Sequence, residues 1–206
     1  MDVVLGLGNP GARYRATRHN VGFHVVDRLA VRAGVSLWRD DGVEASLGVG
    51  RISGRDVVLA KPETFMNRSG RTAVALWSRC DPSDHRFVVV VDDADLDLGR
   101  IRIRPGGGHG GHNGLASIAD ELGTERFVRV RVGVAGPARP DGDLADYVLS
   151  SFGPDETERV EDAIRGAADA VEEVLASGVG PAMNRWNGRV LSPLADGPDE
   201  ASSTQS

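Results

Sequence analysis

The feature that most constrains the fold is a run of apolar residues, 87–91, in which one phenylalanine and four valines follow one another. A strand with one face in water alternates apolar and polar side chains, whereas a strand covered on both faces does not. Residues 3–7 form a second run of this kind. Strands that are buried on both faces need helices on each side of the sheet, which favours an α/β fold.

Further strands and helices alternate along the chain. Apolar residues at helical spacing predict amphipathic helices, and short apolar or alternating runs predict strands. Residues 100–104 alternate arginine and isoleucine, which is typical of a half-buried strand near a sheet edge. The predicted helices are residues 21–33, 67–78, 115–122 and 154–177, and the further strands are residues 45–52, 56–60, 100–104 and 127–134.

We therefore expect a single globular α/β domain over residues 1–188, with a twisted, mixed and largely parallel sheet flanked by helices. The length of 206 residues suits one domain with a sizeable core. Residues 189–206 are small, polar and proline-bearing, which predicts a disordered C-terminal tail.

Composition argues against several classes of protein. The chain is 40% hydrophobic and 26% charged, as in soluble globular proteins. No apolar run approaches the ~20 residues of a membrane span, and the N-terminus has no signal-peptide pattern. Cys80 is the only cysteine, so a disulfide within the chain and a cysteine-based zinc site are both excluded. These features predict a cytoplasmic protein.

The net charge of −6 argues weakly against a nucleic-acid partner, but the charges are unevenly distributed. Of the 24 basic residues, all except Lys61 are arginine, which binds phosphate in bidentate fashion. Arginines gather in residues 100–104 and 126–131, and acids gather in residues 155–173. Two interpretations remain open, a basic face on an acidic protein or simply solvated strand edges.

The first predicted strand ends in the sequence pattern of a dinucleotide-binding loop. Gly6, Gly8 and Gly11 give G-x-G-x-x-G, but Pro10 lies inside the turn and helical spacing begins only at residue 21. A dinucleotide loop needs the third glycine to open a helix whose N-terminus holds the pyrophosphate. The segment therefore indicates a strand end that delivers Asn9 and a loop that delivers Tyr14, Arg18 and His19.

A set of polar side chains follows the strands or lies in adjoining loops, where α/β sheets bind their ligands. A neutral imidazole can take a proton from water, and a carboxylate on its other nitrogen fixes the tautomer. Amides can hold a peptide-like substrate and stabilise an oxyanion. No G-x-S-x-G is present, so the pattern favours water activated by His19, with Asp92 as its carboxylate. The set consists of Asn9, His19, Asn67, Asp92, His112 and Asn113.

Each member of this set also has a local structural explanation. His19 could be a loop histidine bonded to backbone, and Asn67 could cap the helix that follows it. Asp92 or Asp93 could cap a turn, and Asn9 and Asn113 stand in ordinary turn dipeptides. The functional interpretation depends on their joint occurrence.

Two other functions remain as alternatives. A metal-dependent hydrolase could use His109, His112, Asp92 and Asp93, although no compact H-x-x-x-H or H-E-x-x-H spacing is present. A binding protein without chemistry would need neither a general base nor its carboxylate.

Five long motifs follow one another in order along the chain. They are G-L-G-N-P-G-x-x-Y-x-x-T-R-H-N-x-G (residues 6–22), K-P-x-T-F-M-N-x-S-G (61–70), D-D-x-D-L (92–96), G-G-G-x-G-G-H-N-G-L (106–115) and R-V-G-V (131–134). In these motifs the chain resembles bacterial-type peptidyl-tRNA hydrolases. With the helix after Pro154 and the M-N-R segment at residues 183–185, the resemblance covers about 185 residues.

The resemblance implies hydrolysis of the ester between a peptide and the terminal ribose of tRNA, by a usually monomeric α/β protein. It implies no metal, no cofactor, no membrane and no obligate protein partner. His19 matches the family's water-activating histidine, Asp92 its supporting aspartate, and Asn9 the asparagine that separates blocked from free aminoacyl esters. The family's tRNA and peptide contacts match Tyr14, Phe65, Asn67 and Asn113, with Met66 and His112 close by.

One departure from the family pattern concerns the tRNA 5′ phosphate. The family often carries a phosphate-clamping lysine a few residues after R-V-G-V, where this chain reads G-P-A-R-P. We expect Arg139 to take that role, since arginine binds phosphate in bidentate fashion, and rank Arg131 and Arg139 as secondary tRNA contacts.

Overall fold

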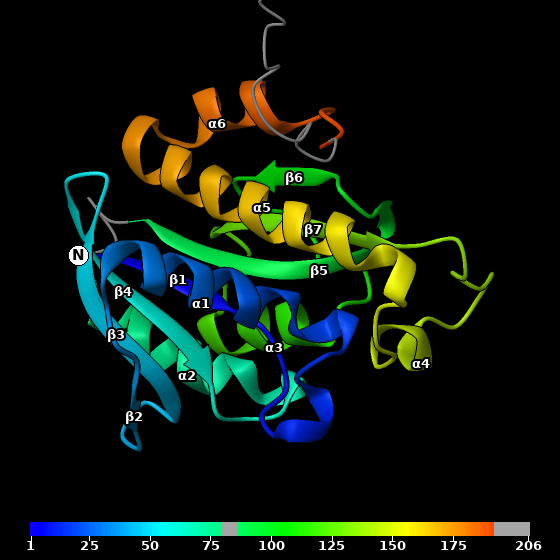
Figure 1. Ribbon diagram of the computed structural model, residues 1–206. Coiled ribbons are helices and arrows are strands. Elements are labelled where there is room, and N and C mark those ends of the chain that lie inside the picture. The colour runs from blue at the N-terminus through cyan, green and yellow to red at the C-terminus, as the bar shows by residue number, and fades with distance from the viewer. Residues whose placement is uncertain (80–85, 192–206) are drawn as a thin grey trace, which may run out of the picture.

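The computed structural model describes residues 1–79 and 86–191 and shows one mixed sheet of seven strands (Figure 1). Their order across the sheet is β2-β3-β4-β1-β5-β7-β6. The expected α/β class and the largely parallel, mixed sheet are confirmed. The strands are β1 (Asp2–Gly6), β2 (Trp38–Asp40), β3 (Ala45–Ile52), β4 (Arg55–Pro62), β5 (Phe87–Asp97), β6 (Ile101–Arg104) and β7 (Val128–Ala135).

The two apolar runs form the centre of the sheet. β1 pairs in parallel with both β4 and β5, and β5 pairs in parallel with β7. The alternating strand β6 lies at one edge, as predicted, and pairs antiparallel with β7. The three-residue strand β2 at the other edge was not predicted. β5 is longer than the apolar run, so Asp92 lies within the strand, opposite Val132, and not after its end.

Helices cover both faces of the sheet (Figure 1). α1 (Val21–Ala33) and α5 (Thr157–Ser177) pack on one face, with α6 (Val179–Trp186) beside α5. α2 (Ser69–Trp77) and α3 (Asn113–Leu122) pack on the other face. The short helix α4 (Ala145–Val148) lies beyond the carboxyl ends of the central strands. Neither α4 nor α6 was predicted as a helix.

The starts of three predicted helices differ from the structure. A 3₁₀ turn (Pro154–Glu156) precedes α5, which therefore begins at Thr157, three residues later than expected. A 3₁₀ turn (Met66–Arg68) precedes α2, which therefore begins at Ser69, two residues later than expected. α3 begins at Asn113, two residues earlier than expected, because the imidazole of His112 caps it. The cap moves the helix N-terminus into the glycine-rich segment.

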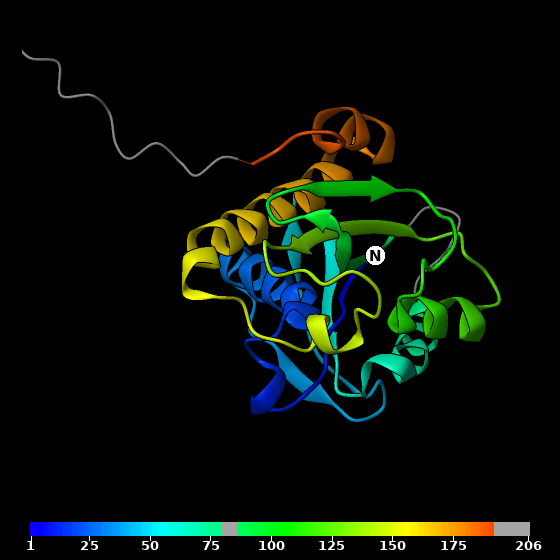
Figure 2. The same cartoon turned by 90° about the vertical axis from the view of Figure 1, so that its right-hand side faces the viewer.

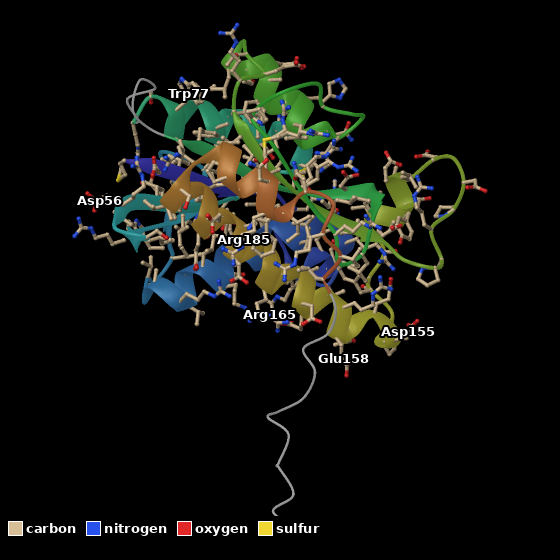
Figure 3. All side chains as sticks on the ribbon, turned by 90° about the horizontal axis from the view of Figure 1, so that it is seen from above. Asp56, Trp77, Asp155, Glu158, Arg165 and Arg185 are labelled. Atoms are coloured by element: carbon tan, nitrogen blue, oxygen red, sulfur yellow. The ribbon has the colours of Figure 1, made fainter. Side chains whose placement is uncertain are left out.

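The acidic cluster in residues 155–173 lies mostly on the solvent-facing side of α5. Arg28 and Arg32 of α1 pair with acids on this helix, and Arg185 of α6 pairs with Glu173. Figure 3 looks down on this face and shows Glu158 pointing away from the body of the protein. In the basic segments, Arg102 and Arg104 are exposed on β6, but Arg129 is buried, so it cannot belong to a basic surface.

Val190 and Leu191, which the sequence assigned to the tail, pair with residues just before β6. Val190 forms a β-bridge with Arg100, and the N–H of Leu191 donates to the carbonyl of Gly99 at 2.9 Å. Residues 192–206, like Cys80, lie outside the described residues. Within the described chain, no helix is both long and apolar enough to cross a membrane.

Two glycines allow α1 to approach the sheet very closely. A Cβ on Gly6 would lie 2.2 Å from the carbonyl oxygen of Gly22. A Cβ on Gly22 would lie 2.5 Å from the carbonyl oxygen of Val90 and 2.6 Å from the backbone of Leu7. The first glycine of the G-x-G-x-x-G pattern thus serves helix packing, while Gly11, at φ 103°, makes the turn.

The close approach predicts that Gly22→Ala destabilises the protein by about 3 kcal/mol, because the backbone atoms facing the new methyl group cannot move without shifting α1. Denaturant unfolding measures the change. Gly180→Ala in α6 is the matched control, since its Cβ would meet no atom within 4 Å. The control should change stability by no more than about 1 kcal/mol. Equal effects of the two substitutions would show that the contact is not tight.

Candidate active site

The predicted histidine and aspartate meet at the end of the sheet where pairing between β1 and β5 stops. His19 lies in a 3₁₀ turn (Arg18–Asn20) that follows the loop after β1, and Asp92 lies two residues beyond the last β5 residue paired with β1. The His19 Nδ1 is 2.9 Å from both carboxylate oxygens of Asp92. Figure 2 faces this end of the sheet, where the turns after β1 (blue), α3 (green) and α4 (yellow) surround the strand ends.

His112 makes a second hydrogen bond to the same carboxylate. Its Nε2 is 3.0 Å from Asp92 Oδ1, and its Nδ1 accepts the backbone N–H groups of Gly114 and Leu115 at 3.1 and 3.3 Å. A nitrogen that accepts two N–H groups carries no proton, so the proton of the neutral ring is on Nε2 and is donated to Asp92. The helix cap therefore assigns the tautomer of His112.

The aspartate is ionised although it is only 2% exposed. Burial opposes ionisation, but the neighbouring imidazoles of His112 and His19 outweigh it and hold the pKa of Asp92 below its ordinary range. An ionised carboxylate on Nδ1 draws the His19 proton to that nitrogen and leaves the Nε2 lone pair available to take a proton. The geometry is that of a general base with its orienting carboxylate.

Asn9 is held by three hydrogen bonds. Its N–H donates to Asn20 Oδ1 at 2.8 Å, and Asn20 Nδ2 donates back to its carbonyl at 3.0 Å. The N–H of Met66 donates to Asn9 Oδ1 at 2.8 Å. Because the side-chain oxygen is occupied, the amide hydrogens are the part that Asn9 can offer to a ligand. The role of Asn20 was missed, although its place beside His19 in the T-R-H-N motif is a signal for it.

A cavity of about 400 Å³ opens beside His19 and Asp92. Asn113 lines it, and α4 supplies Ala145 and Val148 to its wall. Tyr14 and Phe65 form an edge-to-face pair with ring centroids 6.4 Å apart, and Phe65 is 52% exposed. The sequence had no periodic signal for a helix of four residues such as α4, so this wall was not predicted.

The local explanations for two site residues are wrong. Asn67 is exposed and is not the cap of α2, whose N-cap position is occupied by Arg68. Asp92 caps no turn, whereas the neighbouring Asp93 accepts the N–H of Asp95 at 3.0 Å. The turn explanation therefore holds for Asp93 alone.

Of the two secondary arginines, only Arg131 reaches this cavity. Its Nε lies 3.0 Å from Asp93 Oδ2. Arg139 instead donates to the carbonyl of Ala94 and to Asp95, both at 2.6 Å, and lines a separate pocket. Met66 is buried, and its sulfur packs where a Cβ on Gly114 would lie.

The four residues of the metal alternative are not brought together. His109 is exposed and its Nδ1 accepts the N–H of Gly111, and Asp93 faces Arg131. Among the residues that the structure describes, the group able to hold a metal ion is His19, Asp92 and His112, whose ligand atoms lie within 4.8 Å of one another. The hydrogen-bond pattern assigns a proton to each nitrogen that faces Asp92, as in a proton-transfer site.

The fold and this site define a hydrolase, and three comparisons identify the family. The family model described as peptidyl-tRNA hydrolase matches residues 3–193. The chain is 48% identical over 189 residues to the peptidyl-tRNA hydrolase of Chloroflexus aurantiacus, covering 91% of this chain and 99% of that protein. It is 46% identical over 185 residues to that of Mycobacterium tuberculosis, covering 89% and 95%.

A crystal structure of peptidyl-tRNA hydrolase from Acinetobacter baumannii superposes with a TM-score of 0.82. The two chains are 35% identical, and the match covers 92% of this chain and 96% of the other. This chain belongs to the peptidyl-tRNA hydrolase family.

The double role of His112 predicts different outcomes for two substitutions. His112→Asn keeps a side chain that caps helices well but removes the second donor to Asp92, so kcat should fall about tenfold with little loss of stability. His112→Ala also removes the cap and should cost about 1 kcal/mol more in unfolding free energy. Wild-type kcat in a folded His112→Asn variant would contradict the role assigned to the second bond.

Proposed function

We propose that this chain hydrolyses the ester bond between a peptide, or an N-blocked amino acid, and the 3′-terminal ribose of tRNA, releasing tRNA for reuse in translation. Membership of the family supports the reaction. The observation that carries the mechanism is the placement of His19 Nδ1, 2.9 Å from an ionised Asp92, at the edge of a cavity that can receive a substrate.

In the proposed mechanism His19 acts as general base. Its Nε2 takes a proton from water as the water oxygen attacks the ester carbonyl carbon, and the carbonyl oxygen becomes an oxyanion. Asp92 stabilises the imidazolium that forms. The bond between carbon and ribose oxygen then breaks, and the proton passes from His19 to the departing ribose hydroxyl. The products are a peptide with a free carboxyl end and tRNA.

The amide side chains supply binding and selection in this proposal. Asn9, whose oxygen is bound by Met66, directs its amide hydrogens to the peptide carbonyl next to the ester. An N-blocked substrate presents such an acceptor, whereas a free aminoacyl ester presents a charged amine. Asn67 and Asn113, both exposed, provide further donors and acceptors for the peptide backbone.

The tRNA contacts in this proposal come from the rim of the site. The exposed ring of Phe65 and the half-buried ring of Tyr14 offer surface for stacking on bases. Arg131, beside the cavity, is the arginine better placed for a phosphate, and Arg139 is second because Ala94 and Asp95 already hold it. We further propose that the protein works in the cytoplasm as a monomer.

Removing the general base should abolish turnover but not binding. His19→Ala should lower kcat about a thousandfold while binding of N-blocked aminoacyl-tRNA changes little, because the imidazole contributes mainly to proton transfer. Release of the N-blocked amino acid, with unblocked aminoacyl-tRNA as the parallel substrate, measures the first effect. A filter-binding titration measures the second. Turnover that survives in His19→Ala would overturn the assignment.

The same assay separates the two alternative functions. A tRNA-binding protein without chemistry would show salt-sensitive binding and no release of the amino acid. A metal-dependent hydrolase would lose activity after dialysis against a transition-metal chelator, with magnesium kept in the assay to maintain the tRNA. We expect unchanged activity after this dialysis, since His19 and Asp92 suffice for the proposed proton transfer.

A further inference from the structure

An ion pair between Arg18 and Glu156 lies next to the proposed general base, and both of its side chains are buried. Arg18 precedes His19 in the same 3₁₀ turn, and its side chain is 4% exposed. Its two terminal nitrogens donate to the two oxygens of Glu156 at 3.0 and 2.6 Å, and Glu156 is 7% exposed. One of these nitrogens also donates to the carbonyl of Val134 at 3.0 Å.

Aromatic rings and a glycine complete the surroundings of the guanidinium. Its carbon lies 4.5 Å from the ring centroid of Tyr147 and 4.6 Å from that of Phe152. The Tyr147 hydroxyl donates to the carbonyl of Val134 at 3.1 Å and accepts the N–H of Gly136 at 2.8 Å. A Cβ on Gly136 would lie 1.9 Å from Glu156 Oε1, so no larger residue fits there without moving the carboxylate.

This cluster joins parts of the chain that together enclose the site. Arg18 comes from the turn that carries His19, and Val134 comes from the end of β7. Tyr147 comes from α4, the helix that also supplies Ala145 and Val148 to the cavity wall. The backbone N–H of Arg18 also donates to the carbonyl of Ser150, just after α4. One guanidinium therefore ties the general base to the wall opposite it.

Stabilisation of the fold does not by itself explain why two charged side chains are buried here. Removing two charges from water costs free energy that their attraction often fails to recover, and apolar side chains of similar size frequently stabilise as well or better. What an arginine–carboxylate pair adds is direction, because two parallel hydrogen bonds and two stacked rings permit one orientation of the guanidinium. Among the described residues that line the cavity, neither Arg18 nor Glu156 appears, so direct contact with substrate is not its role.

We propose that Arg18, held by Glu156, is a positioning residue that fixes the His19 imidazole against Asp92 and the α4 wall in a single arrangement. The inference rests on the proposed function of His19. A base that is displaced by about 1 Å can lose as much as a hundredfold in rate, so small freedom in this turn has a large effect on the proton transfer.

Glu156→Gln is the main test. The variant keeps the size of the side chain but loses the charge and one of the two parallel bonds to Arg18. We expect kcat for N-blocked aminoacyl-tRNA to fall about tenfold or more, with KM within about twofold, because the substrate contacts are untouched. Glu161→Gln, in the first turns of α5, is the matched control, since Glu161 pairs with Arg28 in an exposed bridge. The control should keep wild-type kcat.

The imidazole of His19 supplies a readout that does not depend on turnover. In the free protein, ¹⁵N chemical shifts of the ring report the tautomer, and a slowly exchanging Nδ1 proton reports the bond to Asp92. We expect Glu156→Gln to weaken this signature in folded protein. A merely structural role would lower the melting temperature and leave the ring signals and kcat of the folded fraction unchanged, which would overturn the proposal.

Two further variants keep the test decisive. Arg18→Lys preserves the charge but cannot form two parallel hydrogen bonds to Glu156, so its kcat should fall below that of the wild type. Wild-type kcat in this variant would contradict the proposal that the two parallel bonds orient the turn. If Glu156→Gln does not fold, Phe152→Leu loosens the guanidinium by removing one stacked ring, and the same loss of kcat and of ring signals is expected. If the wild-type protein releases no N-blocked amino acid, the proposed function fails. In that case the ¹⁵N and Nδ1 proton signals of His19 still test whether Arg18 and Glu156 position the imidazole.

Discussion

The buried carboxylate of Asp92 is the group on which the rest of the site depends. It lies in the central strand of the sheet, where an unpartnered charge would be very costly, and it accepts hydrogen bonds from two imidazoles. One imidazole comes from the turn after β1 and the other caps α3. Keeping this charge satisfied therefore requires both segments to reach the same point of the sheet, and that requirement defines the cavity between them.

The close packing of α1 provides one of these approaches. Gly22 lies against the backbone of Val90 and Leu7 because it has no side chain. His19 precedes Gly22 by three residues, and Asp92 follows Val90 by two, so the contact between helix and strand brings the imidazole within hydrogen-bond distance of the carboxylate. The cluster around Arg18 holds the same turn from the opposite side. The turn that carries His19 is thus held by a backbone contact and an ion pair.

Much of the fold could be predicted because its signals are local. The unbroken apolar runs identify the central strands, and the alternation in residues 100–104 identifies an edge strand, since burial of one or both faces imposes that period. β2 and α4 could not be predicted because three or four residues show no periodicity. The start of α3 was misplaced because its cap is a histidine, whereas serine, threonine, aspartate and asparagine are the usual signals.

The sequence by itself determined the α/β class and the central strands, because these follow from apolar patterning. It also predicted that His19 and Asp92, 73 residues apart, would pair, because both were expected at or beside the carboxyl ends of strands. Only the tertiary structure decided that His112 donates to the same carboxylate, that Asn67 caps no helix and that Arg18 pairs with Glu156. Arg18 and Glu156 are 138 residues apart. Contacts over such separations depend on how strands and helices pack, which no local pattern of residues encodes.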